Sequence, residues 1–507
     1  MRDSYDVIVV GGGGSGLAAA LSAAEHGLSV LLLEKCPELG GTTGIAVGSF
    51  TANRTLYQRR AGIDDNADDH EADAGRFGPP EIQRRNNASL RRLFLEQAAG
   101  TLDWLLGLGL RFHGPSPEPP NRVPRMHNVV PNAKAYIAVL QSRLLRCGGT
   151  ILCDAPVTCL TQEGARVAGV EAAVAGQHVR FTARRGVVLA AGDYANSPEL
   201  IARFKGPEFA HIEGINTYST GDGHRLAEQA GATLVNMDVT YGPELRFVPP
   251  PRKPFTQLLP ASGPVARIMG LGLPFVPRWI ITRMIKRLLV TWQHPENALF
   301  DDGAILVNRQ GQRFCNECVS PDREIAIARQ PEKVAYLLLD GRLCERYSRW
   351  PHFVSTAPEI AYAYVQDYRR MRPDVTATAD SLEQLAAARH LPADALSATV
   401  DQFNRFAQGE IADPLGRQQR VPPLVQAQWV LLGPAKAYFT TTEGGAAINA
   451  QLQVLDQRGQ LIPGLYAVGQ NGLGGQVLWG HGLHIAWALT SGRLVGEVLA
   501  RQPAEGA

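Results

Sequence analysis

The chain begins with a regular alternation of apolar runs and short turns. Residues 5–10 form a β-branched apolar run, which predicts a buried parallel strand, and the alanine-rich residues 17–26 predict a helix directly after it. A second apolar run over residues 29–33 predicts the next strand. The order of strand, helix and strand indicates an α/β fold built on a parallel sheet.

Later patterns extend this fold. Helical spacing predicts helices over residues 93–108, 133–145 and 483–501, and short alternating strands between residues 150 and 189 are typical of an antiparallel meander. The charged stretch from residue 53 to residue 92 predicts a solvated surface loop followed by a helix.

The composition changes after about residue 240, where prolines and long apolar side chains gather. We therefore expect a first domain over residues 1–240 and a second, cap-like domain over residues 241–434. Within the second domain, apolar residues at helical spacing alternate with arginines and lysines from residue 278 to residue 289, which predicts a basic amphipathic helix. Two interpretations of residues 264–291 stay open: packing on the core of the cap, or contact with a membrane surface or an apolar substrate.

Composition narrows the class of protein. A chain of 507 residues, 45% hydrophobic and 19% charged, is typical of a soluble enzyme of two or three domains. A net charge of +2 gives no reason to expect a nucleic acid partner, and seven scattered cysteines indicate reduced thiols in a cytoplasm. With so short a segment before the first strand, no signal peptide is expected, and no apolar window predicts a membrane span. Cys315 and Cys318 lack a second ligand pair, so no metal site is expected.

A glycine turn joins the first strand to the first helix. Gly11, Gly13 and Gly16 fit G-x-G-x-x-G: the first permits a tight turn, the second lets the backbone approach a pyrophosphate, and the third lets the helix pack on the strand. Glu34 ends the second strand about 20 residues later, where an acid binds a ribose hydroxyl. Because the helix also directs unpaired N–H groups at the phosphates, these features predict a dinucleotide site.

A second loop favours FAD. Residues 40–43, Gly-Gly-Thr-Thr, closely follow Glu34 and can hold the longer diphosphate arm of a flavin. At this point the chain resembles the flavoproteins of the fumarate reductase and 3-ketosteroid Δ1-dehydrogenase superfamily. The resemblance recurs, in the family's order, over residues 187–196, 219–232, 303–317 and 462–470.

The resemblance implies an architecture and a cofactor. It implies a Rossmann-type FAD-binding domain with an inserted β-meander, a second α+β cap domain for the substrate, and a return to the first domain over residues 435–507. FAD is expected without a covalent link, because covalent relatives carry a histidine near the loop that holds Thr42 and Thr43 here. The implied cofactor-binding residues are Gly11, Gly13, Gly14, Ser15, Gly16, Glu34, Lys35, Gly40, Gly41, Thr42, Thr43, Val157, Ala191, Gly192, Gly469, Gln470 and Leu483.

The resemblance also bears on the charge of the substrate. Fumarate reductases of this superfamily hold two carboxylates with arginines and histidines, which supply charge-assisted hydrogen bonds. At the corresponding spacings this chain has Thr440, Pro321 and Trp479. We therefore expect a poor site for an acidic substrate.

These replacements favour an uncharged, apolar ketone held by Phe112, Leu478 and Trp479. In the ketosteroid dehydrogenase branch a glycine N–H polarises the substrate carbonyl. Gly482 matches that glycine by its spacing from Gly492.

Tyr194 and His481 are the other candidate catalytic residues. Tyr194 stands in A-A-G-D-Y, where the family has an aromatic wedge beside the flavin ring. Its phenol can act as the base that removes a proton next to the ketone if His481 or His484 lowers a pKa that is ordinarily about 10. Packing is the alternative for this ring. We expect His481 to hydrogen bond to the flavin or the substrate carbonyl and His484 to be structural.

Three functions follow from this reading. The first is an FAD-dependent dehydrogenase that introduces a double bond next to the carbonyl of a cyclic apolar ketone. The second is a reductase of activated alkenes, and the third is a flavin electron-transfer subunit without its own substrate. The chain has no second glycine fingerprint for a nicotinamide, so the expected partner is an external electron acceptor such as a quinone, oxygen or another carrier.

Overall fold

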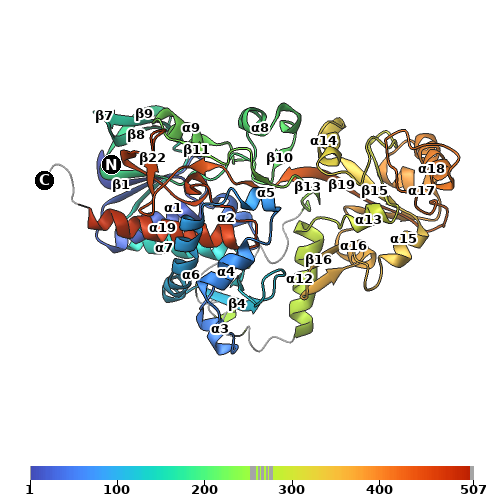
Figure 1. The fold of residues 1–507 in the computed structure, drawn as a ribbon, viewed down its shortest axis with the longest axis horizontal. Coiled ribbons are helices and arrows are strands. Elements are labelled where there is room, and N and C mark those ends of the chain that lie inside the picture. The colour runs from blue at the N-terminus through green and yellow to red at the C-terminus, as the bar shows by residue number, and fades with distance from the viewer. Residues whose placement is uncertain are drawn as a thin grey trace.

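Two sheets organise the chain. The computed structural model describes residues 2–251 and 278–502 and, between these ranges, residues 259, 260, 263, 268, 269 and 272. Figure 1 shows the two sheets as two lobes lying side by side. Part of the stretch 264–291, for which membrane or substrate contact was an open interpretation, lies outside the described residues.

The first lobe is built on a mixed sheet with the strand order β22-β23-β9-β1-β2-β6. β1 pairs in parallel with β2 and β9, and Val9 lies opposite Leu32 on one side and Val188 on the other. β2 is buried along its whole length, as its continuous apolar run predicts. These strands are β1 (Ser4–Val10), β2 (Val30–Leu33), β6 (Thr150–Leu152), β9 (Gln177–Leu189), β22 (Gln453–Leu455) and β23 (Leu461–Ala467).

An antiparallel meander extends this sheet. β7 (Val157–Glu163) pairs with β8 (Arg166–Val174), and β8 pairs with β9. The meander confirms the insertion that was expected in the Rossmann-type domain.

Four helices pack beside the sheet: α1 (Gly14–Glu25), α6 (Ala88–Leu108), α7 (Lys134–Arg146) and α19 (Leu483–Arg501). The last three match the helices predicted from residue spacing. α6 begins earlier than expected because the Asn87 side chain caps it, accepting a hydrogen bond from the Leu90 N–H at 3.2 Å. α1 is buried from Gly14 to Ala24, since β1, α7 and α19 all pack against it.

Glycines bring α1 and α19 into backbone contact. A Cβ added at Gly492 would collide with the Ser15 carbonyl oxygen, and one at Gly496 would meet the Ser22 side chain. The Ser22 hydroxyl donates to the Arg493 carbonyl at 2.7 Å. Because Ser15 lies beside Gly492, and α19 starts well before that glycine, α19 extends past the N-terminus of α1.

The second lobe is an α+β unit. Its sheet has the order β10-β19-β15-β14, and β13 and β18 also pair with β19. β19 continues past residue 434 and β10 joins from before residue 241, so this sheet uses chain on both sides of the expected cap range. The strands are β10 (Glu213–Gly214), β13 (Glu244–Phe247), β14 (Ile305–Val307), β15 (Ala335–Leu339), β18 (Thr376–Ala379) and β19 (Trp429–Phe439), and the helices are α13 (Ala298–Asp301), α14 (Asp322–Ala328), α15 (Gly341–Arg346), α16 (Val365–Met371), α17 (Leu382–Arg389) and α18 (Ala393–Gln408).

A long helix, α12 (Arg278–Trp292), lies at the edge of the second lobe. Leu289 and Val290 are buried, and the Lys286 ammonium lies 3.0 Å from the Asp367 carboxylate of α16. Arg283 and Arg287 are exposed. One face of the described part of α12 therefore packs on the cap and another presents basic residues. In the described part of the chain, every helix is too short or too polar to cross a membrane.

A buried ion cluster corrects the expectation of a solvated loop after residue 53. The Arg125 guanidinium lies 2.7 Å from the Asp65 carboxylate and 2.6 Å from that of Asp73, and all three side chains are buried. Burial alone would raise the pKa of each carboxyl. Hydrogen bonds from Arg125 to Asp65, and from the Arg122 backbone N–H and Arg125 to Asp73, outweigh burial and hold both pKa values below their ordinary range. The charged pattern could not reveal this burial, because the partner arginine comes 60 residues after Asp65 and 52 residues after Asp73 in the chain.

The same cluster fixes a loop that reaches the pocket. Arg125 donates to the Asn121 amide oxygen at 2.9 Å, and the Asn121 N–H donates to the Glu118 carbonyl at 2.9 Å. This loop joins β4 (Arg111–Ser116) to β5 (Met126–Val130). Glu118 is thereby held in place.

The remaining elements are α2 (Gly41–Ile45), β3 (Ser49–Thr51), α3 (Leu56–Arg60), α4 (Ala67–Ala74), α5 (Pro80–Gln83), α8 (Pro198–Phe204), α9 (Asp222–Gln229), β11 (Leu234–Val235), β12 (Thr240–Tyr241), β16 (Ser355–Ala357), β17 (Ala361–Ala363), β20 (Thr441–Thr442) and β21 (Gly445–Ala446), with 3-10 turns over Pro207–Phe209, Pro331–Lys333 and Gly469–Gly472.

Candidate active site

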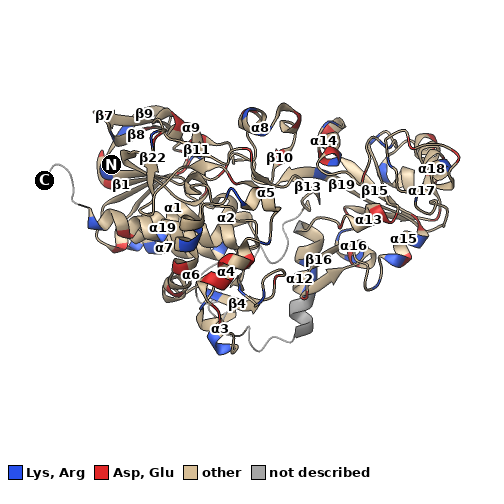
Figure 2. Ribbon diagram, in the orientation of Figure 1, with Lys and Arg blue, Asp and Glu red and all other residues tan. Residues whose placement is uncertain are grey.

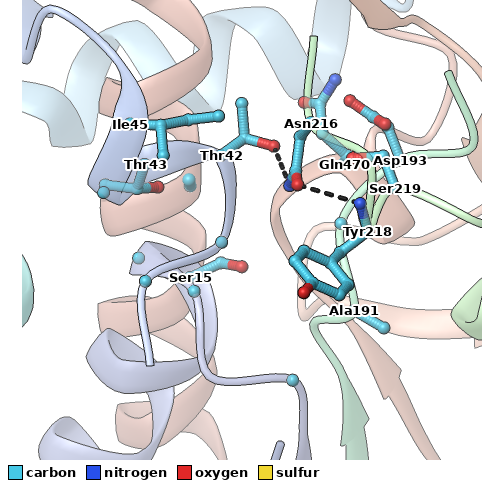
Figure 3. A pocket seen from close by; sticks show the side chains of 18 of the residues that line it. Ser15, Thr42, Thr43, Ile45, Ala191, Asp193, Asn216, Tyr218, Ser219 and Gln470 are labelled. Atoms are coloured by element: carbon cyan, nitrogen blue, oxygen red, sulfur yellow. Dashed lines mark hydrogen bonds between the residues drawn. The ribbon is translucent and has the colours of Figure 1, made fainter. Parts of the chain in front are cut away.

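A cavity of about 1250 Å³ lies at the carboxyl ends of β1, β2 and β9, where ligands bind in open α/β sheets. Val10, Leu33 and Ala190, at or beside the ends of those strands, line it. Figure 3 shows its middle, between the glycine loops and the segment around Asn216. There the Asn216 amide donates to the Thr42 hydroxyl at 3.0 Å. Because Tyr241, Arg246 and Gln293 also line it, one cavity joins the dinucleotide loops to the cap.

The glycine turn has the three properties that its sequence predicts. Gly11 has φ +109°, which a side chain would strain. A Cβ at Gly16 would collide with the Gly11 carbonyl oxygen, so this glycine permits close helix packing. At Gly13 the nearest protein atom would be 3.9 Å from an added Cβ, and this residue lines the cavity. The backbone at Gly13 is thus open to a ligand, and the site fits a pyrophosphate.

Glu34 lies at the expected place for a ribose. Its carboxylate accepts hydrogen bonds from the Gly12 N–H at 2.6 Å and the Cys36 N–H at 2.9 Å. Lys35 lines the cavity and is tied by its ammonium to the Asp222 carboxylate at 2.6 Å. An acid held here at the edge of the cavity disfavours a 2′-phosphate by repulsion.

Most of the expected cofactor residues line the cavity. They are Gly11, Gly13, Gly14, Ser15, Glu34, Lys35, Gly40, Gly41, Thr42, Thr43, Val157, Ala191, Gly192 and Gln470. Gly16, Gly469 and Leu483 lie behind this lining. At Gly469 an added Cβ would come within 2.7 Å of the Ser15 hydroxyl, so its role is close packing.

The cap end of the cavity has a different lining. Tyr241, Arg246, Gln293, Thr440 and Thr441 line it, together with residues 479–482 and 484. Trp479, an expected substrate residue, is among them, and its ring centroid lies 6.0 Å from that of Tyr241. The indole N–H of Trp479 is buried without a hydrogen-bond partner among the described residues. Such an orphaned donor can serve a ligand.

Two expected substrate residues lie outside the cavity lining. Phe112 is 5% exposed and packs against Phe50 and Tyr136, at ring distances of 6.4 and 6.0 Å. Leu478 is fully buried, and its N–H donates to the Glu443 carboxylate at 3.2 Å. Both are core residues in this structure. The sequence could not show this, because strand and loop patterns do not reveal on which side of the cavity wall an apolar side chain lies.

The surroundings of Tyr194 disfavour its expected role as a base. Its side chain is fully buried outside the lining, and its hydroxyl donates to the Met237 carbonyl. Burial, the largest effect, raises the pKa of this phenol instead of lowering it. The ring packs edge-on against His224 at 4.8 Å. The packing interpretation is therefore the one that the structure supports.

His481 forms a dyad with Glu118. Its Nδ1 lies 2.6 Å from the Glu118 carboxylate, which also accepts the His481 backbone N–H at 2.7 Å. The surrounding protein disfavours the imidazolium, but the hydrogen bond and charge of Glu118 outweigh this and raise the pKa of His481 above its ordinary value. Glu118 could not be predicted from the sequence, because it is distant from His481 in the chain and lies in a proline-rich loop.

His484 forms a second dyad that the sequence did not predict. Its Nε2 lies 2.7 Å from the carboxylate of Glu443, which is fully buried. Because an ionised carboxylate only accepts hydrogen bonds, Nε2 must donate, and Nδ1 remains as the nitrogen that can accept a proton. His484 lines the cavity, so this dyad lies where it can contact a ligand.

Gly482 caps α19 at the cavity wall with φ +80°. An added Cβ would come within 2.8 Å of the Thr51 hydroxyl, so only glycine fits. Its own N–H has no hydrogen-bond partner among the described residues. This donor, at the positive end of a helix, can bind a carbonyl oxygen.

Comparison with known proteins agrees with this geometry. The chain matches the FAD binding domain family over residues 6–252 and 273–479. It is 26% identical to the NADH:fumarate oxidoreductase of Klebsiella pneumoniae, over 92% of this chain but only 44% of that protein. It is 25% identical to the 4-oxocyclohexanecarboxylate 2-dehydrogenase of Sinomonas cyclohexanicum, over 99% of this chain and 94% of that protein.

Two solved structures share the fold. An open flavocytochrome c3 fumarate reductase has a TM-score of 0.72 at 24% identity, covering 99% of this chain and 78% of that chain. The 3-ketosteroid delta1-dehydrogenase of Sterolibacterium denitrificans has a TM-score of 0.65 at 20% identity, covering 98% of this chain and all of that chain.

The fold and the cavity together define a flavin-dependent oxidoreductase. The chain belongs to the FAD binding domain family, in the superfamily of fumarate reductases and 3-ketosteroid dehydrogenases. The expected cofactor, FAD, and the expected superfamily are confirmed.

Gly13→Val should weaken FAD binding by roughly tenfold or more, because the side chain would displace a phosphate and remove at least one charge-assisted hydrogen bond. Fluorescence titration of the apoprotein with FAD measures this, and acid precipitation should free the flavin because the link is expected to be non-covalent. Gly107→Val is the matched control, since an added Cβ there meets no atom within 4 Å. Equal affinities in the two variants, or flavin retained in the precipitate, would contradict these expectations.

Tyr194→Phe should leave FAD binding and turnover unchanged, since the buried hydroxyl donates to the Met237 carbonyl and lies outside the cavity lining. The lost hydrogen bond should lower the free energy of unfolding by about 1 kcal/mol. Thermal melts and steady-state kinetics on the same preparation measure both. A large fall in turnover at unchanged FAD content would restore the phenol as a catalytic group.

Proposed function

We propose that this protein is an FAD-dependent dehydrogenase that introduces a carbon–carbon double bond next to the carbonyl of an apolar cyclic ketone. The observation that supports this most strongly is the charge balance at the cap end of the cavity. Arg246 is paired with Glu244 at 2.6 Å, His481 with Glu118 at 2.6 Å and His484 with Glu443 at 2.7 Å.

This balance disfavours a dicarboxylate substrate. Arg246 and His481 already have carboxylate partners, and the Glu443 carboxylate that accepts from His484 is a further negative group at this end, so two additional negative charges would have to compete with these carboxylates. Pro321 stands where fumarate reductases have a residue that holds a substrate carboxylate, and Arg323 lies two positions away. Arg323 already has a carboxylate partner, because its Nε donates to the Glu324 carboxylate at 2.7 Å. Thr440 and Trp479 line the cavity where charged clamp residues were expected in fumarate reductases.

Neutral donors remain to hold a carbonyl group. Gly482 offers a backbone N–H, and Trp479 offers an indole N–H. Tyr241 adds a phenol at the same end, and burial raises its pKa, so the phenol keeps its proton and donates. Donors of this kind stabilise the negative charge that develops on a ketone oxygen when the adjacent carbon loses a proton.

His484 is the group that we assign as the base. Its free Nδ1 can accept the proton next to the carbonyl, and the buried Glu443 carboxylate stabilises the imidazolium that results. His481 acts at the carbonyl instead, because its raised pKa favours the imidazolium, which attracts the developing negative charge. Tyr194 has no role in this assignment.

When bound, FAD supplies the two-electron acceptor for hydride from the neighbouring carbon. The electrons then pass to an external acceptor such as a quinone, oxygen or another carrier. The name of the Sinomonas relative describes dehydrogenation of a cyclic ketone that also carries a carboxylate, so it supports a ring ketone as the reacting group but not the absence of charge. The reverse reaction, reduction of an activated alkene, would use the same residues with the proton moving the other way.

Anaerobic titration tests the direction and the substrate class. Cyclohexanone or a saturated 3-ketosteroid should bleach the flavin absorbance of the purified protein, and fumarate added to chemically reduced protein should not restore it. The reduced protein with an α,β-unsaturated ketone is the control for the reverse reaction. Reoxidation by fumarate, with no bleaching by either ketone, would overturn the proposal in favour of a dicarboxylate reductase.

Glu118→Gln should shift the pH dependence of kcat/KM. In the parent protein the raised pKa keeps His481 protonated to higher pH, so activity that needs the imidazolium is present below that pKa and is lost as pH rises through it. Removing the carboxylate charge lowers the pKa of His481, and the loss of activity should move to lower pH. Glu410→Gln is the control, because this glutamate is exposed and pairs with Arg405. An unmoved profile would exclude His481 as the titrating group.

A further inference from the structure

A cluster of three aromatic rings lies at the surface of the second lobe. Trp350 is 63% exposed, and its ring centroid lies 4.9 Å from that of Tyr362 and 6.2 Å from that of Phe353. Phe353 and Tyr362 are themselves partly exposed. Exposed apolar groups gathered in this way are unusual on a surface that contacts only water.

Exposed basic residues lie on the two helices that pack against β16 and β17. Arg369 and Arg370 of α16 and Arg283 and Arg287 of α12 are exposed, and no carboxylate of the described residues forms an ion pair with any of the four. α12 packs against β16, β17 and α16, the elements beside the rings. Figure 2 shows basic residues on this part of the second lobe.

The acidic groups nearby are largely neutralised. Asp367 pairs with Lys286 at 3.0 Å, and Glu345 pairs with Arg349 at 3.3 Å. Glu359, on the turn between β16 and β17, is exposed and has no ion pair among the described residues. The aromatic-basic patch, defined as Trp350, Phe353, Tyr362, Arg283, Arg287, Arg369 and Arg370, therefore keeps a net positive charge.

We propose that the aromatic-basic patch docks this protein on an anionic lipid surface. Tryptophan and tyrosine rings favour the level of the lipid headgroups, where one side of the ring is apolar and the other wet. Unpaired arginines bind the phosphate and carboxylate groups of the same headgroups. This combination of rings and charge fits a lipid surface better than an acidic protein, which would satisfy the arginines but not the exposed rings.

The patch is connected to the cavity through α12. Gln293, the residue that follows this helix, lines the cap end of the cavity. Docking through α12 and α16 therefore brings the cavity close to the bilayer. This proposal does not depend on the reaction proposed above.

Vesicle sedimentation of the FAD-loaded full chain tests the proposal. The protein should pellet with vesicles of phosphatidylcholine and phosphatidylserine at low salt, less at high salt, and weakly with phosphatidylcholine alone. Arg369→Glu with Arg370→Glu should lower the affinity by roughly tenfold or more. Trp350→Ala should lower it severalfold and leave the salt dependence in place.

Arg146→Glu with Arg180→Glu is the matched control, since it makes the same charge change at two exposed arginines of the first lobe. The control should retain vesicle binding, and flavin absorbance and thermal melts should be unchanged in every variant. Failure of the parent protein to pellet with phosphatidylserine vesicles, or equal losses in the patch and control variants, would overturn the proposal. Capture of a soluble protein through the patch, without vesicle binding, would reassign it to a protein partner.

Discussion

Backbone contact between α1 and its two neighbours is the constraint on which the site depends. Gly16 lets α1 approach the strand end at Gly11, and Gly492 lets α19 approach α1 at Ser15. Side chains at these positions would push the helices apart, because a packed interior tolerates little added volume. The result is that two helix N-termini face one cavity. The N-terminus of α1 suits the phosphates, and that of α19, at Gly482, lies nearer the cap.

Features that depend on neighbours in the chain could be predicted from the sequence. The glycine turn, Glu34 and the length of α19 follow from local spacing, and the structure places them as expected. The meander followed from alternating apolar residues that pair within a few turns. The FAD-binding fold can therefore be predicted from short segments, because each segment contains the residues that form its own turn or helix cap.

Features that depend on distant partners could not be predicted in this way. Glu118 and His481 lie far apart in the chain, and the Arg125 cluster holds the loop that carries Glu118 beside His481. The expected position of the Tyr194 ring could not be checked from the sequence for a related reason. The strand before Tyr194 ends at the cavity, but the ring lies in the core and its hydroxyl donates to the Met237 carbonyl. Burial raises the pKa of the Tyr194 phenol, whereas a position beside His481 or His484 was expected to lower it. The side of a wall on which a residue lies is a tertiary property that spacing does not encode.

The carboxylates around the cavity support the proposed preference for an uncharged ligand. A buried carboxylate without a partner is costly, so the buried Glu118 and Glu443 and the partly buried Glu244 each hold a cationic or hydrogen-bonding side chain beside the cavity. An anionic ligand would weaken those pairs, whereas a ketone leaves them intact and needs only neutral donors. Trp479 and Gly482 provide such donors without adding charge.

The Glu118–His481 and Glu443–His484 pairs also fix the orientation of the two imidazole rings. Each carboxylate engages one ring nitrogen and leaves the other for the ligand. In the proposed reaction the same contacts therefore set both the charge balance and the proton transfer, and a change in one carboxylate would alter both.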